Sequence, residues 1–193
     1  MQDKEYRKLV ISLLVVFSGA AMILTSDFVI RTYFPNRPLL DDVMFRILPY
    51  WPWLAKVADG IIVAGMFVVA IFTQGKLSRM SQVLFAFGFM MFFRGILNAV
   101  TPIGDPSGDT TVYGFLERYP LVGMFPSGHT ASLVLEYWLL KLWDVGATWK
   151  LFFLLLIIAE IFVLLVTHGH YSIDIVGGIV LGYFAVVAAK RYG

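Results

Sequence analysis

The sequence alternates between long apolar stretches and short polar segments. Several of the apolar stretches approach the roughly 20 residues that a helix needs to cross about 30 Å of hydrocarbon. The fourth stretch is the least regular, because Glu136 and Lys141 interrupt it. We expect six helices, at Leu9–Ile30, Leu54–Thr73, Gln82–Val100, His129–Trp143, Trp149–Thr167 and Ile173–Ala189.

The composition also indicates a membrane protein. Hydrophobic residues make up 59% of the 193 residues and charged residues 15%, against about 45–50% and about 25% in soluble domains. The first apolar stretch follows a basic patch, as in a signal peptide, but it exceeds the about 7–15 apolar residues of such a peptide. We therefore interpret it as an uncleaved anchor. The predicted fold is an all-α integral membrane protein, a single six-helix bundle over residues 1–193.

The positive charges predict how this bundle lies in the membrane. If both termini are cytoplasmic, nine of the fifteen Lys and Arg residues fall on the inner side. They are Lys4, Arg7, Lys8, Lys76, Arg79, Lys141, Lys150, Lys190 and Arg191. The positive-inside rule favours this orientation, in which the loops after the first, third and fifth helices face outward. The chain has no cysteine, which excludes disulfides and thiolate ligands.

These outward loops contain most of the candidate chemistry. The first carries "NRPLLDDV" (36–43), the third runs from "TPIGDPSGD" to "FPSGHT", and the fifth is "THGHYSID" (167–174). All three histidines of the chain therefore lie on one side. This pattern predicts a polar site at the outer end of the bundle.

The stretch "FPSGHT" (125–130) has two interpretations. Ser127 is a good N-cap for the fourth helix, since its side-chain oxygen can accept a backbone N–H of the first turn. A helix start also presents free N–H groups and the positive end of the helix dipole, which suits a phosphate. On the second interpretation, Ser127 and Gly128 belong to an anion site with His129 beside it.

The spacing of His170 and Asp174 places both side chains on one face of a helix. An aspartate at that position can accept the Nδ1–H of the histidine, fix its tautomer and leave Nε2 for chemistry. A loop histidine and a helix-capping aspartate are the alternative. His168 points elsewhere if this segment is helical.

Ionisable residues inside the apolar stretches are functional candidates by default. Arg94 lies close enough to the outer end of the third helix to reach the polar loop. Glu136 follows His129 by seven residues and can line the bottom of the same cavity. Asp59 and Glu160 can equally pair with neighbours in the packing, and we assign them no role.

The combination "SGHT" (127–130) and "HYSID" (170–174) resembles the two histidine motifs of the sphingomyelin synthases, a branch of the type 2 phosphatidic acid phosphatase superfamily. "RPLLDD" (37–42) is similar to the Pro-Leu-Pro-Asp segment of that branch, with Leu40 in place of the second proline and Asp41 retaining the acid. "RGILNAVTPIGDP" (94–106) is similar to a further segment, with Arg94, Val100, Thr101 and Pro106 in register.

The resemblance implies a six-helix membrane enzyme with an extracytoplasmic site. The expected reaction moves a phospho-headgroup from a glycerophospholipid to a lipid alcohol such as ceramide or diacylglycerol. His170 would attack phosphorus and form a phosphohistidine, Asp174 would support it, and His129 would protonate the leaving alkoxide. The residues expected to bind the substrate are Arg94, Ser127, Gly128, Asp41 and Tyr171.

Two departures from the wider superfamily favour a monoanionic phosphodiester as substrate. Its phosphatases carry an arginine six residues before the second-motif histidine, where this chain has Leu164, and a Lys-x6-Arg-Pro segment that is missing between Arg94 and Pro126. Arginines are the usual clamps for a doubly charged phosphate. Arg94 would be the main cationic partner, with help from Arg37 or Arg118. The alternative function is a lipid phosphate phosphatase that uses water as the acceptor.

The remaining expectations concern ligands and partners. Choline would favour aromatic faces, and Tyr50, Trp51, Trp53, Tyr113 and Tyr119 lie on the outer side, but an interfacial aromatic belt explains them without a ligand. His129, His168, His170 and Asp174 could form a zinc site, yet the resemblance implies neither a metal nor a cofactor. The expected partners are the donor phospholipid, the acceptor alcohol and the bilayer, with no nucleic acid. A transporter is disfavoured, because the sequence shows neither inverted repeats nor helices broken at the midplane.

Overall fold

The computed structural model describes residues 2–107 and 122–192, and within these ranges the chain forms helices and no β-strand. A helix occupies each of the six predicted positions. The first outward loop adds a short helix, α2 (Val43–Ile47), and a 3₁₀ turn, η1 (Pro52–Leu54). The six long helices are α1 (Gln2–Tyr33), α3 (Ala55–Thr73), α4 (Leu77–Val100), α5 (Gly128–Leu142), α6 (Ala147–Val166) and α7 (Ser172–Tyr192).

Two helices begin about a turn or more before the first residue that their apolar patterns predict. α1 starts at Gln2 instead of Leu9, and α4 starts at Leu77 instead of Gln82. A hydrophobic stretch marks the part of a helix that hydrocarbon can surround, whereas polar residues such as Lys, Glu and Gln also have good helix propensity. The apolar pattern therefore predicts the membrane-embedded part of each helix better than its ends.

Five of the described helical segments are long and apolar enough to cross a membrane. They are Asp3–Tyr33, Pro52–Thr73, Leu77–Val100, Ala147–Val166 and Ser172–Tyr192. α5 differs because its 15 residues extend only about 22 Å at 1.5 Å per residue, short of the roughly 30 Å hydrocarbon core. Of the six expected spans, five are found among the described helices, and α5 is the exception.

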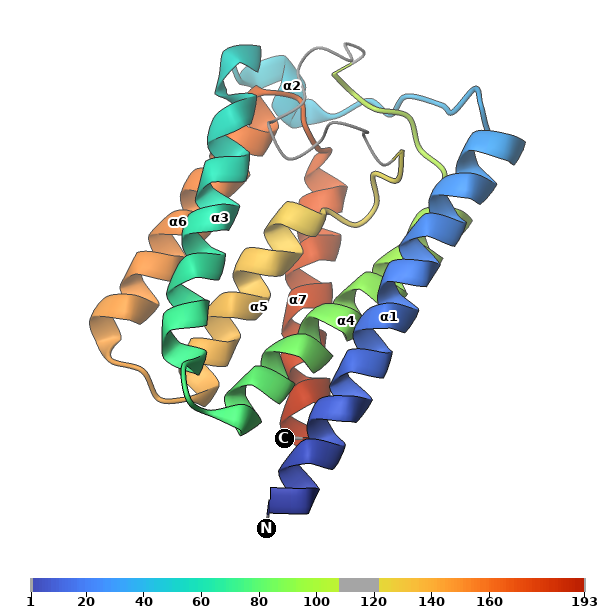
Figure 1. Ribbon diagram of the computed structural model, residues 1–193. Coiled ribbons are helices and arrows are strands. Elements are labelled where there is room, and N and C mark those ends of the chain that lie inside the picture. The colour runs from blue at the N-terminus through green and yellow to red at the C-terminus, as the bar shows by residue number, and fades with distance from the viewer. Residues whose placement is uncertain (1, 108–121, 193) are drawn as a thin grey trace.

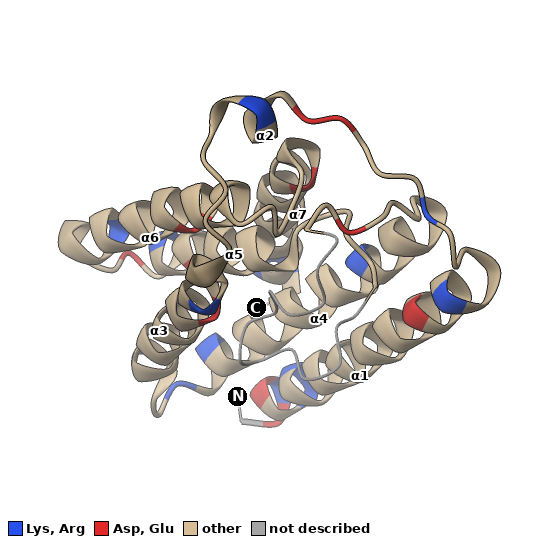
Figure 2. Ribbon diagram, turned by 90° about the horizontal axis from the view of Figure 1, so that it is seen from above, with Lys and Arg blue, Asp and Glu red and all other residues tan. Residues whose placement is uncertain are grey.

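α5 is the central helix of the bundle (Figure 1). It contacts α3, α4, α6 and α7, while α1 packs along α4 at the edge. Figure 2, viewed from above, shows α1 and α4 on one side of the molecule and α3 and α6 on the other. Because other helices surround α5, its apolar side chains face protein on several sides; Ala131, Leu133, Leu135, Leu139 and Leu140 are all fully buried.

Both termini lie at one end of the bundle, and α2 with the loops around it lies at the opposite end (Figure 1). The first outward loop crosses this end, where the backbone N–H of Trp51 donates to the carbonyl of Val166 at 2.6 Å and that of Gly104 donates to Pro38 at 2.9 Å. These hydrogen bonds join segments from three parts of the chain. The arrangement brings the three polar loops together above the helices.

Candidate active site

His170 and Asp174 form the pair that their spacing predicts. His170 lies in the loop before α7, and its Nδ1 is 3.2 Å from Oδ2 of Asp174, in the first turn of that helix. The same carboxylate oxygen accepts the backbone N–H of Tyr171 at 3.0 Å. A carboxylate at Nδ1 favours the tautomer with the proton there, which leaves the lone pair on Nε2.

The environment of His170 keeps its ring neutral. The side chain is 6% exposed, and this burial lowers the pKa of His170 below its ordinary value, although the hydrogen bond and charge of Asp174 act in the opposite direction. Burial has this effect because a charged imidazolium loses its hydration. A neutral imidazole near pH 7 is the form that can act as a nucleophile.

His129 lies in the first turn of α5, beside a carboxylate of another helix. Its Nε2 is 3.3 Å from Oδ1 of Asp59 on α3, and Asp59 is 2% exposed. No role was predicted for Asp59 from the sequence. An ionisable residue within an apolar helix is a sign of a functional residue, but nothing in the sequence indicated that its partner is His129, 70 residues away.

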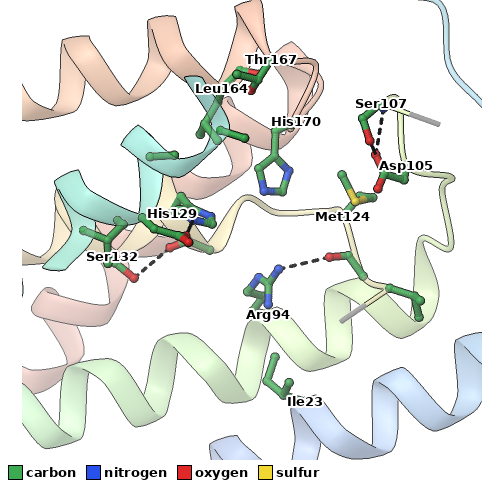
Figure 3. Close-up of a pocket in the computed structure, with 18 of the residues that line it drawn as sticks. Ile23, Arg94, Asp105, Ser107, Met124, His129, Ser132, Leu164, Thr167 and His170 are labelled. Carbon is green, nitrogen blue, oxygen red and sulfur yellow. Dashed lines mark hydrogen bonds and ion pairs between the residues drawn. The ribbon is translucent and has the colours of Figure 1, made fainter. Parts of the chain in front are cut away.

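The two histidines face each other across one cavity. Their ring centroids are 6.3 Å apart with an interplanar angle of 62°, and both rings line a cavity of about 400 Å³. Figure 3 shows His129, His170 and Arg94 converging on the same space from three segments. Since a ring nitrogen acts over about 3 Å, both histidines can reach one phosphoryl group placed between them.

A backbone hydrogen bond fixes the relative position of the two histidine segments. The N–H of Ser127, just before α5, donates to the carbonyl of Asp174 at 2.9 Å. Ser127 is fully buried, and its hydroxyl accepts the backbone N–H of Thr130 at 3.3 Å as the N-cap of α5. It is not among the cavity-lining residues, so the structure favours the capping interpretation of Ser127.

Arg94 lines the cavity and supplies a cation to it. From α4 its guanidinium donates to the carbonyls of Pro126 (3.0 Å) and Gly123 (3.1 Å). Gly128 also lines the cavity, and a Cβ built on it would lie 3.1 Å from Nε of Arg94. Arg37 is a second cation in the cavity wall, donating to the carbonyl of Val122. Arg118 lies outside the described residues.

Three other expected residues lie away from the cavity. The Asp41 carboxylate is 72% exposed and pairs with Arg46 on the surface. Tyr171 is buried beneath the first outward loop, where its hydroxyl accepts the backbone N–H of Leu40 at 3.1 Å. Glu136 does not line the bottom of the cavity; its carboxylate lies against Gly65 of α3. Two turns of α5 separate it from His129, which places it below the floor of the site.

The aromatic residues of the outer side and the potential metal ligands were considered as further parts of the site. Tyr50 packs against His168 in a tilted arrangement with ring centroids 4.6 Å apart, and Trp51 packs edge-on against Phe162. Neither aromatic residue lines the cavity, and Trp53 is 72% exposed. Tyr113 and Tyr119 lie outside the described ranges. Across those ranges no group of three or more potential ligands is placed to hold a metal ion.

Comparison with known proteins agrees with the motifs. Residues 124–191, which contain both histidines, match the family model described as PAP2 superfamily C-terminal. The chain is 22% identical over 212 aligned residues to phosphatidylcholine:ceramide cholinephosphotransferase 1 of Caenorhabditis elegans. That alignment covers 93% of this chain and 44% of the relative, so the chain spans less than half of the relative's length. No solved structure gives a significant match. The resemblance of the two histidine motifs is thereby confirmed, and the chain is similar to the sphingomyelin synthase branch of the type 2 phosphatidic acid phosphatase superfamily.

Proposed function

We propose that this protein is a membrane-embedded lipid phosphotransferase that moves a phospho-headgroup from a glycerophospholipid to a lipid alcohol such as ceramide or diacylglycerol. The observation that carries the proposal is the pair of facing histidines, with ring centroids 6.3 Å apart beside Arg94. Each ring has its own carboxylate partner. A double displacement at phosphorus requires such a nucleophile and an acid–base group on opposite sides of one atom.

In the first step, Nε2 of neutral His170 attacks phosphorus. A P–N bond forms as the bond from phosphorus to the glycerol oxygen breaks, and protonated His129 gives its proton to the departing diacylglycerol alkoxide. Asp174 stabilises the positive charge that develops on the His170 ring, as the aspartate of a catalytic triad does for its histidine. Arg94 offsets the negative charge on the phosphoryl oxygens.

In the second step, the acceptor alcohol occupies the place that diacylglycerol has left. His129, now neutral, removes the proton of the alcohol, whose oxygen attacks phosphorus as the P–N bond breaks. The headgroup passes to the acceptor, and the electron pair of that bond returns to Nε2 of His170. Asp59 would hold His129 in place for both proton transfers, because its carboxylate is within 3.3 Å of Nε2.

The wall of the cavity supports a phosphodiester substrate. Leu164, at the position where the superfamily's phosphatases carry an arginine, is 3% exposed and lines the cavity. An apolar side chain there cannot stabilise the second negative charge of a phosphomonoester, whereas a phosphodiester carries only one negative charge. The alternative, a lipid phosphate phosphatase, shares the first step and differs in the acceptor, which would be water.

A labelled lipid distinguishes the two functions. Purified protein receives phosphatidylcholine or phosphatidylethanolamine labelled in the headgroup, with and without ceramide or diacylglycerol, and in parallel a labelled phosphatidic acid. We expect label in a new lipid only when the acceptor is present, and no product with His170→Ala. Release of free phosphate from phosphatidic acid, without a new labelled lipid from the phosphodiesters, would support the phosphatase instead. Equal product from the wild type and His170→Ala would overturn the mechanism in both forms.

A further inference from the structure

Asp42 joins two segments that are distant in the sequence. Its Oδ2 accepts the backbone N–H of Ser172 at 2.6 Å, and its Oδ1 accepts the hydroxyl of the same residue at 2.9 Å. Oδ1 also accepts the backbone N–H of Met44 at 2.9 Å, as the N-cap of α2. One carboxylate, 9% exposed, therefore holds the first outward loop and the start of α7 together.

The contacts around Asp42 extend this connection along the whole loop. The backbone N–H of Leu40 donates to the hydroxyl of Tyr171. The ring of Phe45 stacks on His168 with centroids 4.1 Å apart and contacts Tyr171 at 5.6 Å. The loop that carries His170 is thus held from outside by the backbone of Leu40 and the side chains of Asp42 and Phe45.

Asp42 is also suited electrostatically to the start of α7. Burial raises its pKa, but the hydrogen bonds from Ser172 and Met44 outweigh this, so the pKa of Asp42 lies below its ordinary value. The carboxylate is consequently charged near neutral pH. A negative charge at a helix N-terminus is favourable because the first N–H groups of the helix have no intrahelical acceptor.

We propose that Asp42 is a positioning residue that holds the His170–Asp174 pair in its reactive geometry by fixing Ser172 from the first outward loop. Ser172 lies two residues from His170 and two from Asp174, so its N–H is anchored at the middle of the pair. Without this anchor, the first turn of α7 and the His170 ring can shift together relative to His129. The inference rests on the proposed function for its activity readout and on the His170 ring itself for an independent one.

The inference distinguishes two adjacent carboxylates. Asp41, the carboxylate expected from the sequence to bind substrate, is exposed and pairs with Arg46. Asp42 is buried and bonded to the segment that carries the nucleophile. Replacing Asp42 should therefore affect turnover more than replacing Asp41.

Variants at both ends of the contact test the proposal. Asp42→Ala removes the carboxylate that accepts the Ser172 N–H, and Ser172→Pro removes that N–H at the first position of a helix, where proline is well tolerated. We expect each to lower kcat roughly tenfold with little change in KM, as a small misplacement of a reacting group does.

Because both remove the same contact, the double variant should be no slower than the slower single variant. Ser172→Ala, which keeps the N–H, should lose only about two- to threefold. Asp144→Asn, a 96% exposed carboxylate paired with Lys150, is the control for neutralising a charge.

A second readout does not require catalysis. The rates at which diethyl pyrocarbonate modifies His170 and His129 are measured by mass spectrometry, and their ratio should change in Asp42→Ala and Ser172→Pro but not in Asp144→Asn. If the transferase and phosphatase assays both fail while this ratio changes, the proposed function is wrong and the positioning role stands. Wild-type kcat and an unchanged ratio in Asp42→Ala, or losses that multiply in the double variant, would overturn the positioning role.

Discussion

His170 and His129 each lie beside a carboxylate, but the two carboxylates come from different places. Asp174 follows His170 by one helical turn, whereas Asp59 reaches His129 from α3. His170 therefore keeps its partner as long as the first turn of α7 is intact. The pairing of His129 depends on the packing of α3 against α5. The position of the proposed nucleophile, His170, is therefore set locally, whereas that of the proposed acid–base group, His129, depends on tertiary structure.

The pH dependence of turnover tests the His170–Asp174 pair. The nucleophile must be neutral, so the rate rises with pH through the pKa of His170. Asp174 raises this pKa against the effect of burial; in Asp174→Asn the pKa falls further, and the acid side of the pH–rate profile should move to lower pH. At the optimum, kcat should fall by about 10²-fold or more, because an amide no longer fixes the tautomer. A profile of kcat against pH checks both effects, and a shift to higher pH would contradict this role of Asp174.

At the residue scale, the sequence predicts contacts within one helix better than contacts between helices. The spacing of His170 and Asp174 was sufficient, since residues four apart share a helical face. Asp59 and His129 meet only because α3 and α5 pack with a particular rotation, which the apolar pattern does not specify. The contact of Asp42 with Ser172 was not predicted for a similar reason: in an irregular loop, adjacent side chains such as those of Asp41 and Asp42 can point in opposite directions.

At the scale of elements, α5 and α7 set the distance between the two histidines. Gly178 of α7 faces the start of α5, where a Cβ would lie 2.7 Å from the carbonyl oxygen of Ser127. One turn later, a Cβ on Gly182 would lie 2.5 Å from the carbonyl oxygen of Ala131. Small residues let two membrane helices approach this closely. The sequence predicted α5 as a helix. It did not predict the central position of α5, because an apolar stretch does not indicate whether lipid or protein surrounds it.

A single methyl group should disturb this contact. In Gly178→Ala the added Cβ meets a backbone carbonyl that cannot rotate away, so α7 must move from α5. We expect the overpacking to destabilise the protein by about 1–3 kcal/mol, seen as a lower unfolding temperature in detergent, and kcat to fall as the histidines separate. Gly60→Ala is the matched control, since a Cβ there meets nothing within 4 Å and alanine should instead improve helix stability by up to about 1 kcal/mol. Equal stability of the two variants would show that the α5–α7 contact tolerates the change.

At the scale of the whole molecule, the three polar loops and the catalytic candidates share one end of the bundle, and both termini share the other (Figure 1). The sequence led to the same grouping, because each predicted crossing reverses the side of the next loop. The distribution of Lys and Arg then favours a cytoplasmic location for the end of the bundle that holds both termini. We infer that the cavity opens on the extracytoplasmic side, where the headgroups of that leaflet are within reach of His129 and His170.

Cysteine labelling tests this orientation directly, because the chain contains no cysteine of its own. Leu39→Cys places a thiol in the first outward loop, where the side chain is 65% exposed, and Gln74→Cys places one in the exposed turn between α3 and α4 at the end that holds the termini. A membrane-impermeant maleimide added to intact cells should label Leu39→Cys and should label Gln74→Cys only after permeabilisation. Each variant should keep transferase activity, so that labelling reports the native fold. The reverse pattern would place the histidines on the cytoplasmic side, and the donor and acceptor lipids would then have to come from the inner leaflet.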